Sequence, residues 1–211
     1  MIAIAVALPT AGADPGELLA DAGAYEAAGA HAVWIGEPVL TGASPGFDPW
    51  PFLGAMAAVT SRLRIGLTLA EPLSWPAPML AAQRQAVDWL SRGRLLLAAT
   101  TAELQATSGA GFLVGTAGAV VRVAAGVSCG ALLLDPQPGE MSAICAEVGP
   151  EAEVWPVFGV PANRAQWREL REQLSAAGVA GVVIRHDPRL LDLIRNPDLE
   201  DDRQDTQLAQ G

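Results

Sequence analysis

Short apolar runs alternate with longer amphipathic stretches along most of the chain. The apolar runs predict strands at residues 2–8, 32–35, 63–69, 94–98, 112–114, 131–134, 154–158 and 182–184. Between them, the pattern predicts helices at residues 14–28, 47–61, 78–90, 117–127, 141–148, 164–177 and 188–195. Seven or eight short strands separated by helices indicate a mainly parallel sheet, either closed into a barrel or open and doubly wound.

Two of the predicted helices carry a distinct apolar face. In the helix at 164–177, the residues that share a face are Trp167, Leu170, Leu174 and Ala177. In the helix at 78–90, they are Leu80, Val87 and Leu90. We expect these faces to pack against the sheet.

The alternation is lost only between residues 99 and 112. The stretch from 100 to 111 is too short for a full helix-plus-strand unit, and 211 residues are fewer than the ~250 typical of a complete (β/α)8 barrel. We therefore predict an α/β fold of the (β/α)8 TIM-barrel type, shortened or irregular in the middle, with seven to eight parallel strands. A single domain is expected over residues 1–197, followed by an acidic tail at 198–211.

Composition narrows the classes of partner. The net charge of -10 repels phosphate backbones and anionic membranes, and no apolar run is long enough to span a bilayer. Residues 1–9 are apolar but lack the basic region of a signal peptide. We expect a cytoplasmic protein with no nucleic-acid or membrane partner. Cys129 and Cys145 do not have a metal-site spacing, so no metal site is predicted.

Three segments are similar to one enzyme family. They read AGAYEAAGAHAVWIGEP at 22–38, AAVTSRLRIGLTL at 57–69 and PAPMLAAQRQAVDWLSRGRLLLAA at 76–99, with a weaker similarity over 112–134. In the third segment the residues at the family's spacing are Gln83, Asp88, Leu90, Ser91, Gly93 and Arg94. The chain thus resembles the bacterial-luciferase-like monooxygenases. The resemblance implies a (β/α)8 barrel that binds reduced FMN or F420 at the C-terminal strand ends and acts on a small organic substrate.

The sequence departs from this family where the family commonly carries histidines. Glu37 is followed by Pro38, and Trp75 precedes Pro76 in place of a second histidine. The fourth-helix and fifth-strand region, which helps to hold the cofactor phosphate in relatives, is shortened. Two hypotheses follow: a flavin- or F420-dependent oxidoreductase, or a catalytically inactive flavin-binding or partner-stabilising paralogue of the nonfluorescent-flavoprotein kind.

Candidate site residues lie at the predicted C-terminal strand ends, because barrel enzymes build their sites there. The catalytic candidates are Glu37 and His186, a carboxylate and an imidazole suited to acid–base chemistry. The cofactor-binding candidates are Thr68, Glu71, Thr100, Trp75 and Arg185. Alternatives stay open at this point: Arg185 could form a surface ion pair, and His186 could be a solvated loop residue. Asp135 is a further strand-end carboxylate, whereas His31 begins a strand at the opposite end, where a structural role is expected.

The second predicted helix carries a small apolar stretch at residues 55–59. Luciferase-like proteins often dimerise through helices near strands two and three, so the resemblance implies a homodimer or pairing with a full-length relative. The alternative is that this stretch packs against the chain's own sheet.

Overall fold

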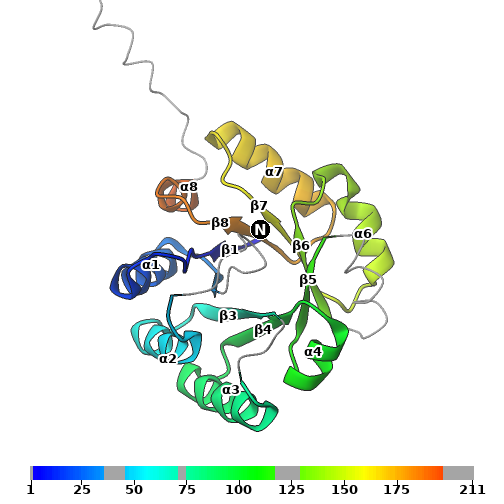
Figure 1. Cartoon of the computed structure of the whole chain (residues 1–211). Helices are drawn as coiled ribbons and strands as arrows, with labels where there is room; N and C mark the ends of the chain where they lie inside the picture. The colour runs from blue at the N-terminus through cyan, green and yellow to red at the C-terminus, as the bar shows by residue number, and fades with distance from the viewer. Residues whose placement is uncertain (1, 36–45, 71–74, 117–128, 197–211) are drawn as a thin grey trace, which may run out of the picture.

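Eight parallel strands close into a barrel in the order in which they occur along the chain (Figure 1). The computed structural model describes residues 2–35, 46–70, 75–116 and 129–196. The strands are β1 Ala3–Ala7, β2 Ala32–Ile35, β3 Arg64–Leu69, β4 Leu95–Ala99, β5 Phe112–Gly115, β6 Gly130–Leu134, β7 Val154–Phe158 and β8 Gly181–Arg185. β1 pairs with β8 as well as with β2, so the sheet has no free edge. The predicted (β/α)8 barrel is confirmed, and the open sheet is excluded.

Helices surround the strands on the outside of the barrel (Figure 1). They are α1 Pro15–Ala28, α2 Pro49–Val59, α3 Ala77–Ser91, α4 Ala102–Ser108, α6 Met141–Val148, α7 Arg164–Ala176 and α8 Leu190–Arg195, with a 3-10 turn, η1, at Pro138–Glu140. Side-chain caps fix several of the starts: the carboxylate of Asp14 accepts hydrogen bonds from the backbone N–H groups of Gly16 and Glu17, and Thr101 caps α4 in the same manner. The helix predicted at 117–127 and the tail at 198–211 lie outside the described residues.

The middle of the barrel is shortened at the link between β4 and β5. Residues 100–111, expected to break the alternation, contain α4, a seven-residue helix that links β4 directly to β5. Gly109 ends this helix in the left-handed conformation, with φ of 64°, which allows the chain to turn at once into β5. A two-turn helix therefore suffices for this crossover, so the middle of the barrel is shortened, as predicted, while the alternation of strand and helix continues through it.

Three aromatic rings fill the inside of the barrel, each against a glycine on the next strand. Trp34 on β2 is the register partner of Gly66 on β3, and Phe112 on β5 is the partner of Gly130 on β6. In both cases, a Cβ on the glycine would overlap the ring. Trp155 on β7 stands in the same relation to Gly181 on β8. The barrel is therefore a packed core, not a pore.

One arginine fastens α2 and α3 to the barrel wall. All five N–H donors of the Arg94 guanidinium reach oxygens: the carbonyls of Ala57, Thr60, Leu63 and Ser91, and the Thr60 hydroxyl, at 2.6–3.1 Å. Two of these carbonyls belong to the C-terminal end of α2, where backbone acceptors lack helical partners. Arg94, which immediately precedes β4, thus provides hydrogen-bond donors for the carbonyl groups at the C-terminal end of α2.

A carboxylate holds the turn between α2 and β3. Glu26 of α1 accepts hydrogen bonds through Oε1 from the backbone N–H groups of Ser61, Arg62 and Leu63, at 2.8, 2.5 and 2.8 Å. Burial raises the pKa of Glu26, but these N–H donors outweigh it and hold the pKa below its usual range. This contact ties α1 to the second βα unit.

The apolar face of α7 packs as predicted, with Trp167 and Leu174 fully buried, whereas that of α3 is only partly right. Leu80 and Val87 are buried, but Leu90 is 63% exposed. On α2, Met56 and Ala57 pack inward, as the alternative for this helix anticipated, while Val59 faces solvent. Within the described residues, no helix is both long and apolar enough to cross a membrane.

Candidate functional site

An ion pair lies at the C-terminal mouth of the barrel. Arg185 is the last residue of β8. It lies on the same inward face of the strand as Val183 and Gly181. Its guanidinium donates two hydrogen bonds to the carboxylate of Asp135, at 2.7 and 2.8 Å. These hydrogen bonds and the positive charge lower the pKa of Asp135, although partial burial opposes the shift.

The backbone around Asp135 is built to present this carboxylate. Asp135 directly follows β6 and has a positive φ of 45°, which is uncommon outside glycine and is tolerated best by Asp and Asn. Its N–H donates to the carbonyl of Val157 on β7 at 3.0 Å. The pair therefore joins the ends of β6 and β8 across β7. Arg185 therefore forms an ion pair, one of the two roles expected for it, and its partner is Asp135.

Two threonines lie at the ends of β3 and β4. Thr68 is buried, on the same inward register as Gly66, and pairs with Ala98 of β4. Thr100 follows β4, is half-buried, and donates its N–H to the carbonyl of Leu69 at 3.2 Å. Thr68 and Thr100 therefore lie at the same end of two neighbouring strands, as the sequence predicted.

Aromatic rings stand beside this end of β3. The indole of Trp75, just before α3, meets the indole of Trp50 edge to face, with 6.3 Å between ring centroids and an interplanar angle of 81°. Trp50 lies in the first turn of α2, and its buried Nε1 has no hydrogen-bond partner within the described residues. A buried indole N–H without an acceptor is unusual in a folded protein. Trp50 was not a candidate from sequence, because a tryptophan in a helix is most often a core residue.

His186 points away from the barrel axis. It follows Arg185, so its side chain faces outward, where Nδ1 lies 2.9 Å from the hydroxyl of the fully buried Tyr25 on α1. Its Nε2 lies 3.9 Å from the carboxylate of Asp21 on the same helix. Desolvation of the phenol and the nearby Asp21 and Asp187 charges raise the pKa of Tyr25 well above its usual range. The structure therefore separates His186 from Thr68 and Arg185 and ties it to α1.

Two further candidates, Glu37 and Glu71, fall outside the described residues, so their positions relative to the mouth are not defined. His31 lies before β2 at the N-terminal end, stacked on the ring of Trp155 with centroids 5.8 Å apart. Within the described parts of the chain, no group of three or more His, Cys, Asp or Glu side chains is arranged to hold a metal ion.

The mouth thus presents two inward threonine side chains and a guanidinium above a filled barrel, while the Trp50–Trp75 pair packs in the outer core between strands and helices. A family model described as luciferase-like monooxygenase matches residues 1–112, slightly more than half of the chain. The chain belongs to the luciferase-like monooxygenase family. The match covers β1 to β4 with their helices and ends where β5 begins.

Solved structures share the fold across nearly the whole chain. The coenzyme F420-dependent tetrahydromethanopterin reductase from Methanopyrus kandleri has a TM-score of 0.73 at 10% identity, covering 93% of this chain and 97% of that one. An F420-dependent secondary alcohol dehydrogenase in complex with an F420-acetone adduct also has a TM-score of 0.73 at 10% identity, covering 94% and 98%. A long-chain alkane monooxygenase has a TM-score of 0.69 at 9% identity, covering 92% and 89%.

At these identities the likeness establishes the fold alone. Among curated proteins, none matches the chain with significant similarity.

Proposed function

We propose that this luciferase-like protein is an oxidoreductase that binds reduced FMN or F420 at the C-terminal mouth and acts on a small organic substrate. Family membership carries the proposal, because the matched segment contains β3 and β4 and hence Thr68 and Thr100. When bound, such a cofactor would supply hydride or two-electron chemistry. The chain's own residues would hold it in place and keep water away from it.

The residues at the mouth fit a flat ring with a polar edge. Thr68 and Thr100 follow the inward register of β3 and β4, and their hydroxyls can donate to ring heteroatoms or accept from them. The fit to a cofactor phosphate is poorer, since the Arg185 guanidinium is engaged by Asp135.

A second candidate function is favoured by the positions of the histidines. The chain has two, and neither imidazole faces the mouth: His186 bonds Tyr25, and His31 lies at the opposite end. Asp135 is a weak base because Arg185 lowers its pKa. General acid–base catalysis would then depend on Glu37 or Glu71. If neither carboxylate acts as an acid or base, the protein would be a cofactor-binding or partner-stabilising paralogue.

Cofactor titration tests the proposal. We expect FMN or F420 to quench tryptophan fluorescence with a micromolar or weaker dissociation constant, equivalent to about -8 kcal/mol at best. Thr68→Val should weaken binding by about tenfold, as expected for one lost hydrogen bond, whereas Thr107→Val on exposed α4 is the isosteric control. Nanomolar affinity, or retention of cofactor through purification, would contradict weak binding. An absence of saturable quenching by either cofactor would contradict the site itself.

Turnover separates the two candidate functions. An oxidoreductase should oxidise reduced F420 faster when an aldehyde or ketone is present to accept the hydride, and should reduce oxidised F420 faster when a small alcohol is present to donate one. With reduced FMN, it should oxidise the cofactor faster in the presence of alkanes when dioxygen is supplied as the oxidant. Cofactor binding with no acceleration by any of these substrates would favour the inactive paralogue.

We also propose that the chain forms a homodimer or pairs with a full-length relative, through α2 and α3. Among the described residues, the large apolar side chains that are exposed all belong to these two neighbouring helices: Val59 of α2 and Met79, Trp89 and Leu90 of α3. Trp89 is 83% exposed, an unusual position for an indole on a free surface. The surface therefore extends beyond the stretch of α2 noted from sequence.

Light scattering tests this surface. We expect a mass near twice the 21.8 kDa of the monomer at micromolar concentration, and a shift to the monomer in the Trp89→Glu variant. Ala165→Glu, at an exposed position of α7, adds the same charge away from this surface and serves as control. A monomeric wild-type protein would refute self-pairing.

A further inference from the structure

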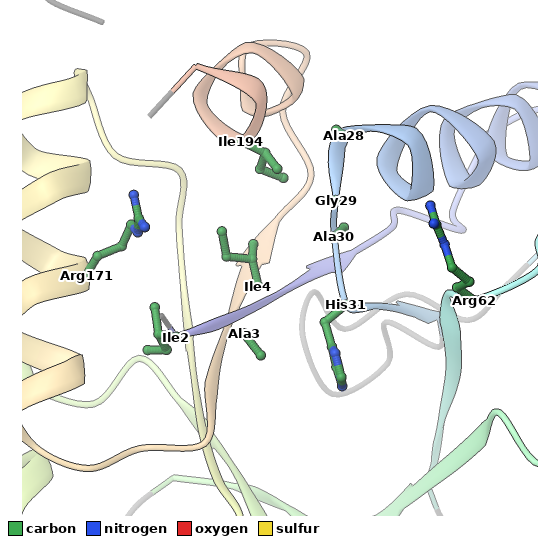
Figure 2. A pocket seen from close by; sticks show the side chains of 10 residues that line it. All are labelled: Ile2, Ala3, Ile4, Ala28, Gly29, Ala30, His31, Arg62, Arg171 and Ile194. Carbon is green, nitrogen blue, oxygen red and sulfur yellow. The ribbon is translucent and has the colours of Figure 1, made fainter. Parts of the chain in front are cut away.

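A pocket of about 540 Å³ opens at the N-terminal end of the barrel, opposite the mouth. It is lined by the start of β1, the turn between α1 and β2, and side chains from α7 and α8 (Figure 2). Ile2, Ile4 and Ile194 provide aliphatic side chains, which we call the isoleucine floor. The volume lies within the range of small-ligand sites.

The charged side chains that line this pocket are both arginines. Its titratable lining residues are His31, Arg62 and Arg171, with no Asp or Glu among them, in a chain whose net charge is -10. Figure 2 shows the isoleucine floor between Arg171 on one side and His31 and Arg62 on the other. Arginines that line a pocket without a lining carboxylate favour an anion as the ligand.

Arg171 has a hydrogen-bond donor that no acceptor in the described residues satisfies. Its Nε is buried and has no hydrogen-bond partner, and its guanidinium lies 5.8 Å from the ring centroid of Trp167. Within the described residues, no carboxylate lies within ion-pair distance of Arg171 or of Arg62. Such a guanidinium retains the planar donor fork that matches a carboxylate.

We propose that this N-terminal pocket binds a small aliphatic carboxylate, with its carboxylate on Arg171 and its chain on the isoleucine floor. The floor selects for hydrocarbon and the guanidinium for a planar anion, so the two requirements together define the ligand class. The site is distinct from the mouth because the aromatic rings of the barrel interior lie between them.

His31 lines the pocket as an imidazole that burial keeps neutral. Burial of the imidazole lowers the pKa of His31, the neighbouring Arg64 cation on β3 lowers it further, and Glu153 before β7 opposes the shift. The neutral imidazole stacks on Trp155, which itself donates through Nε1 to Glu153 at 3.1 Å. Because Arg64 and Glu153 act in opposite directions on His31, Arg171 is the group that would carry the bound anion.

Octanoate is the probe, with octanamide lacking the charge and acetate lacking the chain. We expect calorimetry to show saturable binding of octanoate at one site, with octanamide and acetate each at least about tenfold weaker. The chain's two histidines give a second readout by NMR: the imidazole signals of His31 should shift with the same dissociation constant, while those of His186 should not.

Substitution of Arg171 tests the assignment of the anion. Arg171→Gln should weaken octanoate binding by about tenfold or more, Arg171→Lys should retain part of it, and Arg168→Gln on the same helix should leave it unchanged. Cofactor titrations of these variants should not change. Equal binding of octanoate and octanamide, or unaltered binding to Arg171→Gln, would overturn the proposal. If Arg171→Gln does not fold, the ligand series and the His31 shifts in the wild-type protein decide the question.

Discussion

Adding one methyl group inside the barrel should be severely destabilising at Gly66. A Cβ at this position would lie 2.9 Å from Cε2 of Trp34 and closer still to two other ring atoms, whereas carbon atoms in contact lie about 3.5 Å apart. The indole would have to move by roughly 1 Å, but the ring of Phe112 meets it edge to face with centroids 5.8 Å apart. We therefore expect Gly66→Ala to cost about 3 kcal/mol, the upper part of the range for overpacked cores.

A double-mutant cycle identifies the cause of this loss. Trp34→Phe alone should cost about 2 kcal/mol by leaving a cavity, but in the Trp34→Phe background Gly66→Ala should cost about 1 kcal/mol or less. Urea unfolding followed by circular dichroism gives each free energy, provided that the slope with denaturant is unchanged. The control is Gly23→Ala in α1, where an added Cβ meets nothing within 4 Å and should stabilise the helix slightly. Additive losses in the cycle would refute the clash as the cause.

Three further predictions concern the contacts around α2 and α3. Arg94→Met should destabilise the protein by about 3–4 kcal/mol in the same assay, because five hydrogen bonds are lost; an Arg94→Lys variant as stable as wild type would contradict a role for the planar fork. Glu26→Gln should cost roughly 1–2 kcal/mol at pH 7. Because the folded-state pKa of Glu26 is lowered, this difference should shrink as the pH falls below about 4.5 through the folded-state value, and a pH-independent difference would contradict it. Arg92→Gly should stabilise the protein by roughly 0.5 kcal/mol in thermal unfolding, since Arg92 ends α3 with a φ of 58°; Arg92→Ala, which keeps the Cβ, should not.

The order and type of the elements could be predicted from sequence because each strand is a short, largely apolar run. All eight strands lie within one residue of their predicted bounds, and β2 and β7 coincide with them. The exception, α4, has only seven residues, so its apolar contribution is limited to Leu104 and leaves no periodic signal. A sequence signal for the start of α4 is nevertheless present in Thr101, a residue type that commonly caps helices. The Thr101 hydroxyl accepts a hydrogen bond from the backbone N–H of Leu104 at 3.1 Å.

The candidate site could be predicted only as far as strand ends define it. Thr68, Thr100 and Arg185 were found because the C-terminal ends of parallel strands meet at one mouth. His186 shows the limit: it follows a strand in the same way, but the period of two along β8 turns its ring outward to Tyr25. The unsatisfied Nε1 of Trp50 has no sequence signature, because it depends on which atoms surround a buried ring.

The ring-and-glycine pairs inside the barrel also determine how molecules can come and go. With Trp34, Phe112 and Trp155 occupying the interior, no molecule can cross the barrel from the mouth to the opposite end. Substrate and product must therefore enter and leave on the same side of the barrel as a cofactor at the mouth, and a large cofactor would have to bind without blocking the smaller molecule. Residues at the rim, rather than those beneath it, would then govern the order of arrival and departure.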